Sequence, residues 1–410
     1  MQSNRVLFIS YDGLTDPLGQ SQILPYLVEL NKLNYEITIL STEKDENFLK
    51  NKQTIELICD KEGIKWDYIT YTKKPPVLAT IKDISLLLRK VKSLHAETPF
   101  NILHCRSYIS ALVGLNMKKK LGIKFLFDMR GFWADERVDG GIWSISNPIF
   151  KKVYNFFKKK EKEYLLNADH TVSLTHNGRD EIMSWEFFKA SKKDNISVIP
   201  CCADLNHFDF NKHKDNRGLK ASLSIDSDDE VICYLGSIGT WYMMEEMMDY
   251  FSIHLKKYPK TIFLWITKDE PDYIIEKATE KGIENNIRIK ASERFGLPDL
   301  LSICSASIFF IKPLFSKKAS SPTKMAELLG MGIPLICNTN VGDTDGIVLK
   351  EGVGVVINDF NETSYQEAVD QFKELKMVPR EKLREVAKQY FSLEEGVTSY
   401  DKIYESLLEN

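Results

Sequence analysis

Residues 306–338 read ASIFFIKPLFSKKASSPTKMAELLGMGIPLICN, and this stretch decides the fold class. Its two ends, Ala306–Ile311 and Ile333–Cys337, are short and almost continuously apolar, which is typical of strands covered on both faces of a parallel sheet. The residues between them predict a connecting helix. A strand, a helix and a second strand in this order indicate an α/β fold.

Capping and turn residues set the limits of that helix. We expect Ser321 to be the N-cap and Pro322 to occupy the first helical position, because these residue types favour those places. The helix is predicted to run through Met325–Met331, with Gly332 as its stop signal and Pro334 preventing continuation. It therefore begins at the C-terminal edge of the sheet, where open α/β folds bind ligands.

The same alternation of strand and helix patterns extends over the chain and restarts near residue 231. Two Rossmann-like, doubly wound parallel sheets are therefore predicted. The predicted strands are Arg5–Ser10, Glu36–Ser41, Trp66–Thr70, Asn101–Cys105, Lys124–Asp128, His170–Ser173 and Ile196–Ile199, then Val231–Leu235, Thr261–Thr267, Asn286–Lys290, Ala306–Ile311, Ile333–Cys337 and Gly354–Ile357.

The restart divides the chain into two domains. Residues 199–217 are polar and irregular, and a proline directly follows the preceding strand, as expected of a linker. We place an N-terminal domain at 1–205 and a C-terminal domain at 206–390. Helical patterns close the sequence, and they are Ser364–Lys376, Arg380–Gln389 and Leu393–Leu408.

The composition is that of an ordinary globular protein, with 410 residues, 43% hydrophobic residues and a formal net charge of −3. This charge balance argues against a protein that coats nucleic acid by charge alone. The sequence enters a strand without a signal-peptide pattern, and no apolar run approaches the roughly 18 residues of a membrane-spanning helix, so we expect a cytoplasmic protein. The seven scattered cysteines fit reduced thiols, and no Cys/His spacing resembles a zinc site, so no metal is expected.

The first turn of the predicted helix has the chemistry of an anion site. Its free N–H groups and positive dipole favour a phosphate, and Ser320, Ser321, Thr323 and Lys324 add hydroxyl groups and an ammonium group. Glu327 lies one turn beyond Lys324 on the same face and could accept hydrogen bonds from a ribose diol. The alternative is an ordinary capped helix with a surface Lys–Glu pair.

Two loops that join a strand to a helix contain glycines, which let a ligand approach the backbone closely. The first loop is YDGLTDPLGQ at residues 11–20, and the second is GSIGTW at residues 236–241. Neither has the spacing of a dinucleotide fingerprint, so ordinary turns are the alternative. The candidate ligand-binding residues of these loops are Gly13, Gly19, Gly236, Ser237 and Gly239.

A third group of polar residues lies in FLFDMRGFWADERVDGG, residues 125–141, directly after a predicted buried strand. Charges at this edge of a sheet are candidate site residues, and the aromatic residues could stack on sugar faces. For a single histidine, a hydrogen-bonded place in the core is the alternative. The candidates are Asp128, Arg130, Trp133 and Glu136, together with His104 and Arg106 at the end of the preceding strand.

The helical pattern PIFKKVYNFFKKKEKEYLL, residues 148–166, contains six lysines and two glutamates. Its basic and apolar residues suggest the hypothesis that it lies on an anionic membrane surface. The alternative is a helix that packs on its own sheet.

Taken together, these segments resemble the GT-B-fold retaining glycosyltransferases of family 4 over nearly the whole chain. DGLTDPLGQSQILPYL (12–27) is similar to the family's acceptor-side loop, and YLGSIGTWY (234–242) to the glycine loop at the donor diphosphate. SSPTKMAELLGMGIPLI (320–336) is similar to the donor-binding helix and following strand, the most specific of these matches. FSLEEGVTSYDKIYESLL (391–408) resembles the helix that crosses back to the N-terminal domain, so residues from about 391 to 410 are assigned there.

The chain departs from the family pattern at three places. The family often has a Glu-x7-Glu pair, and Glu327 matches its ribose-binding second member, but the first member falls on Ala319. The cations that usually neutralise the diphosphate are missing near Ser237, so Lys324 is expected to supply that charge. Asp128 or Arg130 is expected to take the place of the usual histidine at the donor sugar.

The resemblance implies two Rossmann-like domains facing across a cleft and a retaining hexosyltransferase. The donor would be a UDP-sugar or GDP-sugar, with no cofactor and no metal. Asp128, Arg130, Lys324 and Glu327 would act in catalysis, and His104, Arg106, Trp133 and Glu136 would lie on the acceptor side. The acceptor would be a glycan or lipid-linked hydroxyl in cell-envelope polysaccharide or glycoconjugate synthesis, handled at the inner face of the cell membrane.

Two other functions stay open at this point. The first is a GT-B-fold sugar-nucleotide epimerase, for which Asp128, Glu136 and His104 offer acid–base groups. The second is a non-catalytic GT-B subunit of a transferase complex, for which the missing glutamate and the missing loop cations argue.

Overall fold

The computed structural model describes residues 4–213 and 217–409, and it divides the chain into two compact units. Unit 1 comprises Met1–Pro200 and Leu393–Asn410, and unit 2 comprises Cys201–Ser392. The sequence predicts the first boundary after residue 205 and the second after residue 390. Each unit is described by itself below.

Unit 1 is built on a seven-stranded sheet in which every pairing is parallel, in the order β3-β2-β1-β4-β5-β6-β7. Its strands are β1 Asn4–Ser10, β2 Tyr35–Glu43, β3 Lys65–Thr70, β4 Ile102–Arg106, β5 Lys124–Asp128, β6 His170–Ser173 and β7 Ile196–Val198. Its helices are α1 Pro17–Gln22, α2 Leu24–Lys32, α3 Asp45–Glu62, α4 Pro76–Glu97, α5 Ser107–Leu121, α6 Trp133–Asp139, α7 Pro148–Asn167, α8 His176–Ser184, α9 Glu186–Ser191 and α19 Leu393–Glu409.

Unit 2 repeats the design with a six-stranded parallel sheet in the order β10-β9-β8-β11-β12-β13. Its strands are β8 Glu230–Leu235, β9 Thr261–Ile266, β10 Ile287–Lys290, β11 Ala306–Phe309, β12 Leu335–Asn338 and β13 Gly354–Ile357. Its α-helices are α10 Arg217–Ser222, α11 Met244–Lys257, α12 Asp272–Glu280, α13 Leu297–Ser302, α14 Thr323–Gly330, α15 Thr344–Glu351, α16 Glu362–Asp370, α17 Phe372–Leu375 and α18 Arg380–Phe391. Three short 3-10 helices complete it, and they are Glu284–Asn286, Arg294–Gly296 and Phe315–Ala319.

The structure confirms the predicted α/β class, because each predicted strand overlaps one observed strand. Two helical stretches are each divided into two helices in the structure. The stretch that follows the first glycine loop divides into α1 and α2 around Ile23, just before Pro25, and the predicted helix Ser364–Lys376 divides into α16 and α17. A proline close to the start of α2 removes a backbone N–H, which accounts for the first break.

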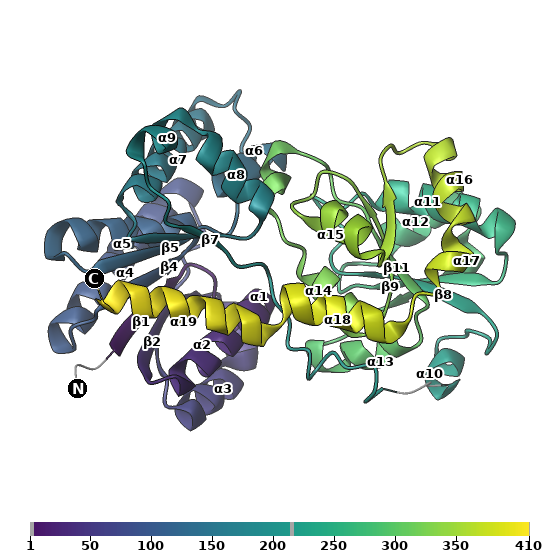
Figure 1. Cartoon of the computed structure of the whole chain (residues 1–410), viewed down its shortest axis with the longest axis horizontal. Coiled ribbons are helices and arrows are strands. Elements are labelled where there is room, and N and C mark those ends of the chain that lie inside the picture. Colours follow the sequence, from purple (N-terminus) through teal and green to yellow (C-terminus); the bar gives the residue numbers. More distant parts are fainter. Residues whose placement is uncertain (1–3, 214–216, 410) are drawn as a thin grey trace. The chain divides into compact units, whose positions relative to one another are not determined.

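Helix α19 completes unit 1 although it follows unit 2 in the sequence. Figure 1 shows α19 in yellow beside α2 and the sheet that contains β1 and β4. Its Tyr400, Ile403, Tyr404 and Leu407 are buried, and the Tyr404 ring packs edge-on against Tyr35. Burying two tyrosines and two aliphatic side chains stabilises this position by several kcal/mol on the usual scale of ~1.5–3 kcal/mol per large side chain.

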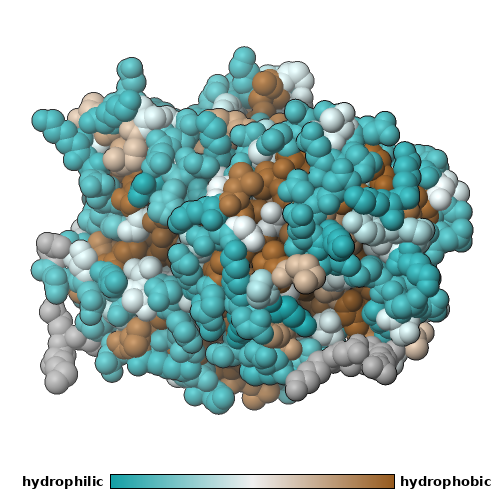
Figure 2. Space-filling model, turned by 45° about the vertical axis from the view of Figure 1, so that its right-hand side comes forward, coloured by the Kyte–Doolittle hydropathy of each residue, from teal (hydrophilic) through white to brown (hydrophobic). Residues whose placement is uncertain are grey.

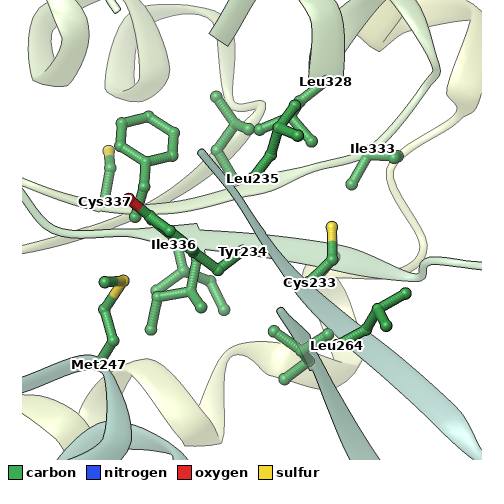
Figure 3. Packing of buried hydrophobic residues seen from close by; sticks show 14 of the residues in the cluster. Cys233, Tyr234, Leu235, Met247, Leu264, Leu328, Ile333, Ile336 and Cys337 are labelled. Carbon is green, nitrogen blue, oxygen red and sulfur yellow. The ribbon is translucent and has the colours of Figure 1, made fainter. Parts of the chain in front are cut away.

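The core of unit 2 lies on both faces of its sheet. Figure 3 shows Tyr234 of β8 near Ile336 of β12, with Leu328 of α14 on one side of the strands and Met247 of α11 on the other. All four side chains are fully buried. The continuous apolar runs that predicted the strands are therefore explained by cover on both faces.

The loop after β1 is tightly closed against β2 by one carboxylate. Buried Glu43 accepts hydrogen bonds from the backbone N–H groups of Leu14 at 2.7 Å and Thr15 at 3.2 Å. A Cβ atom on Gly19 would lie only 2.1 Å from the carbonyl oxygen of Gly13. Gly19 is thus needed for close packing within the loop itself, whereas the predicted approach of a ligand to Gly13 and Gly19 stays a prediction.

We expect Gly19→Ala to destabilise unit 1 by about 1–3 kcal/mol, because its methyl group overlaps the backbone of the loop. Gly346→Ala is the matched control, since Gly346 is also helical but a Cβ atom there would meet nothing within 4 Å. That control should stabilise the protein by up to ~1 kcal/mol. Thermal unfolding followed by calorimetry measures both effects, and equal shifts of the two variants would contradict the role of the closed loop.

Candidate functional site

Each sheet has one point where the strand order reverses, and such switch points hold the ligands of open α/β folds. In unit 1 the reversal lies between β1 and β4, and in unit 2 it lies between β8 and β11. The glycine loop after β8 and the segment leading from β11 to α14 therefore begin at the same edge of the unit 2 sheet. Most of the predicted donor-site residues lie in these two segments.

Helix α14 starts one residue later than predicted. Thr323 is its first residue, Pro322 is the N-cap with an extended backbone, and no side chain caps the helix. The prediction of Ser321 as N-cap is therefore wrong. The Ser321 hydroxyl instead accepts a hydrogen bond from the backbone N–H of Cys201 at 3.2 Å, which ties the start of α14 to the first residue of unit 2.

Lys324, in the first turn of α14, is enclosed by aromatic rings. Its ammonium nitrogen lies 3.7 Å from the ring centre of Tyr242 and 4.3 Å from that of Tyr234, and it donates a hydrogen bond to the Tyr234 hydroxyl at 3.3 Å. A Cβ atom on Gly236 would lie 2.9 Å from the same nitrogen. The structure thus brings Lys324 and the glycine loop close together, and a side chain at position 236 would displace the end of the lysine.

The surroundings of Lys324 disfavour its charged form. The residue is 7% exposed, and burial lowers the pKa of its ammonium group well below the usual value, an effect that the carboxylate of Glu327 opposes. Cation–π contact with two tyrosine rings offsets part of the lost hydration. An anionic ligand at the glycine loop would favour the charged form of this buried lysine.

Glu327 is also buried, and it forms an ion pair with Arg294 whose N–O distance is 2.8 Å. Burial raises the pKa of the Glu327 carboxyl, and the Arg294 guanidinium opposes that shift. The guanidinium also lies over the ring of Phe208, 5.0 Å from its centre. The carboxylate is therefore held in a fixed direction, one turn after Lys324 in α14.

The loop from Gly236 to Tyr242 folds back onto the strand edge. Tyr242 forms an antiparallel bridge with Ile311, and the Tyr234 hydroxyl donates to the carbonyl oxygen of Ser237. Gly236 has a φ of +128°, a conformation that side chains rarely adopt, whereas Gly239 faces open space. The backbone conformation therefore favours glycine at position 236.

The other predicted donor residues lie around the start of α14. The backbone N–H of Ser320 donates to the carbonyl oxygen of Lys317 at 3.1 Å, and Thr323 is half-buried at the first helical position. Ser320, Ser321 and Thr323 thus belong to the same turn as Lys324. Their roles as ligand donors stay predictions.

In unit 1 the structure gathers three of the predicted residues around a fourth, the buried carboxylate of Asp128. Asp128 is 1% exposed, and its oxygens lie 3.7 Å from Arg106, 3.8 Å from Arg130 and 3.5 Å from His104. Burial would raise the pKa of Asp128, but Arg130, His104 and Arg106 together lower it. Asp128 is therefore a carboxylate held ionised in the interior.

Backbone geometry supports this cluster at the ends of β4 and β5. Ser107 and Arg130 have positive φ angles of 66° and 57°, and Gly131 follows with 103°. A residue other than glycine in the left-handed region is strained by about 1 kcal/mol or more, and such strain concentrates at functional sites. The loop after β5 thus directs Arg130 back toward Asp128.

Trp133 and Glu136 lie on α6, and Trp133 belongs to an aromatic cluster. Its ring centre is 4.9 Å from that of Phe157 and 5.2 Å from that of Trp143, and the guanidinium of Arg137 lies 5.1 Å above it. The packing of α6 on α7 therefore uses the aromatic residue that we assigned to sugar stacking. The acceptor-side assignment of Trp133 and Glu136 stays a prediction.

The lysines of α7 have different surroundings from one another. The side chain of Lys158 points into the protein. Its ammonium nitrogen lies 2.8 Å from a carboxylate oxygen of Asp135 and 2.5 Å from one of buried Glu161. Lys160 pairs with Glu163 at 3.0 Å. Lys151, Lys152 and Lys159 are exposed. Part of the positive charge of α7 is therefore neutralised by pairing within unit 1, and the membrane hypothesis for this helix stays a prediction.

Carboxylates that could hold a metal are few in the described part of the chain. Asp226, Asp228 and Asp229 bring oxygens within 4.8 Å of one another in an exposed turn before β8. Asp345 instead accepts hydrogen bonds from the backbone N–H groups of Asn340 and Gly346, both at 3.1 Å. These hydrogen bonds hold the Asp345 carboxylate to the backbone around the start of α15.

Sequence reasoning missed the residues that hold the predicted ones in place. They are Glu43, Tyr234, Tyr242, Arg294 and Tyr404. Only the tyrosines of the second-domain loop lie close in sequence to a predicted residue. Arg294 precedes its partner by 33 positions and Tyr404 follows His104 by 300, and no local pattern connects residues at such separations.

Two family sequence models match the chain. The first, described as Glycosyltransferase Family 4, matches residues 25–207, and the second, described as Glycosyl transferases group 1, matches residues 215–390. No curated protein matches the chain. The two models between them cover most of the sequence, and each lies largely within one structural unit.

Solved structures show the same architecture at low sequence identity. A sucrose-phosphate synthase from Thermosynechococcus elongatus is 14% identical with a TM-score of 0.72, and 99% of each chain is covered. A glycosyltransferase from Rickettsia africae is 16% identical with a TM-score of 0.71 and complete coverage of both chains. The Anabaena protein HepE in complex with UDP-glucose is 12% identical with a TM-score of 0.68, covering 98% of this chain and 99% of that one.

We expect Lys324→Met to stabilise the protein at neutral pH by about 1–3 kcal/mol, the usual penalty for an incompletely compensated buried polar group. Because folding lowers the pKa of Lys324, the unfolded chain binds a proton that the native protein lacks, so the stability of the wild type rises with pH toward the ordinary lysine pKa. The advantage of the variant should therefore shrink at alkaline pH. Urea unfolding from pH 7 to 10 measures it, with the exposed Lys312→Met as the charge control, and an advantage independent of pH would contradict this account.

Proposed function

Because the chain belongs to the GT-B-fold glycosyltransferases of family 4, we propose that it moves a hexose from a nucleoside-diphosphate sugar to a hydroxyl group of an acceptor with retention of configuration. The donor is a UDP-sugar or a GDP-sugar. The acceptor is a glycan or lipid-linked sugar of cell-envelope polysaccharide or glycoconjugate synthesis. HepE, which shares this fold, has been crystallised with UDP-glucose, and this supports the donor class.

The observation that carries this proposal is the contact between Lys324 and Gly236 at the start of α14. Departure of a nucleoside diphosphate develops negative charge on its phosphate oxygens. A helix N-terminus and a lysine that are already in place stabilise such charge without reorganisation. Burial disfavours the charged form of Lys324 in the free protein. A bound diphosphate would favour protonation of this lysine and would then be stabilised by its positive charge.

Glu327 fits the ribose of the same nucleotide. Its carboxylate is buried, is oriented by Arg294 at 2.8 Å and lies one turn beyond Lys324. A diol can donate two hydrogen bonds to a carboxylate, and hydrogen bonds to a charged group contribute about 1.5–3 kcal/mol each. Residues of one helix would thus bind both the nucleoside and the diphosphate.

Unit 1 supplies the groups for the transferred sugar and the acceptor. Asp128 and Arg130 are assigned to the donor sugar, and His104, Arg106, Trp133 and Glu136 to the acceptor side. In the family the departing phosphate is thought to take the proton of the acceptor hydroxyl, so the reaction needs no strong base from the protein. The proposal includes no metal and no cofactor, and transfer should therefore proceed in the presence of a chelator.

The family match favours a transferase over the epimerase alternative. The second alternative, a non-catalytic subunit, is distinguished by turnover. Binding of a nucleotide sugar without transfer to any cell-envelope acceptor would favour it, whereas release of an epimerised sugar without an acceptor would favour the epimerase.

Glu327→Ala should weaken binding of UDP or GDP by about 1–3 kcal/mol, since it removes a charged hydrogen-bond acceptor. The substitution also frees Arg294, so the parent nucleotide alone does not isolate the ribose contact. Isothermal titration should therefore compare each nucleotide with its 2′,3′-dideoxy form on both proteins. If Glu327 holds the diol, the dideoxy nucleotide binds both proteins with similar affinity, and equal losses for the two nucleotides would contradict the assignment.

Lys324→Met should lower kcat roughly tenfold or more, because the ammonium group stabilises charge that grows in the transition state. Lys312→Met, which removes an exposed charge from the same region, should leave kcat unchanged. Steady-state kinetics with the nucleotide sugar in the presence of a chelator give kcat and KM separately. A change confined to KM would show that Lys324 binds the ground state and the transition state equally.

We also propose that unit 1 associates peripherally with an anionic membrane at the cytoplasmic side. No helix in the described part of the chain is long and apolar enough to cross a bilayer. The start of α7 and the loop before it expose Ile145 at 55% and Ile149 at 60%, beside the exposed Lys151 and Lys152. The face drawn in Figure 2 carries several separate hydrophobic patches on a mostly hydrophilic surface, so exposure alone is not diagnostic. The combination with lysines favours a lipid surface.

Sedimentation with phosphatidylserine vesicles tests this association. The variant Lys151→Glu with Lys152→Glu should bind at least roughly tenfold more weakly, because each lysine near an anionic leaflet contributes about 1 kcal/mol. Ile149→Ser should also reduce binding, whereas Leu49→Ser, at an 83% exposed position on α3, should not. Lys158 is unsuitable for substitution because it pairs with Asp135 and Glu161. Equal binding by all variants, or none by the wild type, would leave an acceptor in solution as the better proposal.

A further inference from the structure

Three buried polar side chains form a chain of contacts inside unit 1. The Tyr404 hydroxyl of α19 lies 2.7 Å from Nδ1 of His104 in the middle of β4. The other ring nitrogen of His104, Nε2, lies 3.5 Å from Oδ2 of Asp128 at the end of β5. All three side chains are at most 2% exposed.

The charge of Asp128 determines which ring nitrogen of His104 carries the proton. The neighbouring Arg130, His104 and Arg106 lower the pKa of Asp128, so its oxygens can only accept hydrogen bonds at neutral pH. The nitrogen of His104 that faces Asp128 must then carry a proton. Burial lowers the pKa of His104, so its ring is neutral and has one proton, which lies on Nε2. Nδ1 is therefore the acceptor, and the Tyr404 hydroxyl is the donor.

The ring of His104 is also held by packing. Phe8 of β1 lies edge-on to it with ring centres 4.5 Å apart, and Tyr400 of α19 lies at 5.2 Å. The charged groups that face the ring are Asp128, Arg106 and Arg130. With the plane fixed by packing and the tautomer fixed by Tyr404, the imidazole turns Nε2 toward the carboxylate at 3.5 Å, a close electrostatic contact whose geometry falls short of a hydrogen bond.

One oxygen of Asp128 lacks a hydrogen-bond donor in the described part of the chain, and the protein encloses it. Its Oδ1 accepts no hydrogen bond from the described residues, and Nη1 of Arg130 lies 3.8 Å from it. A buried carboxylate oxygen without a donor is unfavourable by about 1–3 kcal/mol, so it is expected to have a use. A sugar hydroxyl is a donor of the right kind.

We propose that Tyr404 is a positioning residue for sugar transfer: its hydroxyl fixes the tautomer of His104, and His104 in turn holds Asp128 with Oδ1 directed to a sugar hydroxyl. The last step rests on the proposed function, which assigns Asp128 to the sugar. The tautomer does not depend on that assignment. The terminal helix α19 thereby acts on the site through two residues of the sheet.

NMR of the resting protein tests the proton arrangement directly. In protein labelled with ¹⁵N at histidine, long-range proton–nitrogen correlations distinguish the two tautomers, and the loss of one signal in His104→Gln assigns His104. We expect a neutral ring with the proton on Nε2 at pH 7. A proton on Nδ1, or a charged ring, would overturn the proposal without any substitution at Tyr404.

Tyr404→Phe removes the hydroxyl and keeps the ring. We expect the His104 signal to shift or to split between tautomers, and kcat to fall about tenfold with little change in nucleotide affinity, as for loss of a residue that orients a functional histidine. Tyr35→Phe is the matched control, because Tyr35 donates to Asp401 of the same helix at 2.6 Å and does not bond His104. It should change neither the tautomer nor kcat.

A conservative replacement separates positioning from packing. The amide of His104→Gln can accept from Tyr404 and donate to Asp128, so this variant should keep more activity than His104→Leu. Equal loss in both, or wild-type kinetics and an unchanged His104 signal in Tyr404→Phe, would refute the positioning role. A wild-type protein that transfers no sugar would instead refute the proposed function, while the NMR result would still decide the tautomer.

Discussion

Parallel pairing of every strand within both sheets is the constraint on which the remaining structure depends. Parallel strands need crossover connections, so every loop that follows a strand reaches the same edge of its sheet. In unit 2 this edge receives Gly236 after β8 and the segment that leads into α14 after β11. In unit 1 it receives Arg106 at the end of β4 and Asp128 at the end of β5. Residues far apart in sequence thus become neighbours because their strands are neighbours.

A second feature common to both units is the burial of charged groups at that edge. Lys324 is surrounded by tyrosines, Glu327 is paired with Arg294, and Asp128 lies among two arginines and a histidine. Buried ionisable groups are unfavourable for folding unless they are well paired. These groups lie near the points where the strand order reverses, and Arg130 has a left-handed backbone. Binding sites commonly combine such features, because a site can keep groups that lower the stability of the fold when they contribute to binding.

Local patterns predicted the strands and the helix with Lys324 and Glu327, because apolar runs and capping residues act over a few positions. They did not predict that Lys158 turns inward, since its partner Glu161 looks like one more exposed residue of a charged helix. They also placed the N-cap at Ser321, whose hydroxyl instead accepts a hydrogen bond from the backbone N–H of Cys201, 120 positions earlier in the sequence. Contacts such as Arg294 with Glu327 depend on which strands adjoin, and no single stretch of sequence contains that information.

The position of α19 has a consequence for the order in which the protein matures. During translation the ribosome releases the strands of unit 1 first, then all of unit 2, and only afterwards the residues that bury Tyr400 and Tyr404. Until then the pocket around Tyr35 and His104 lacks its cover, and apolar surface is left in contact with water. The folding of unit 1, which is synthesised first, is therefore completed last. The contacts from Tyr404 through His104 to Asp128 form only after all of unit 2 has been synthesised.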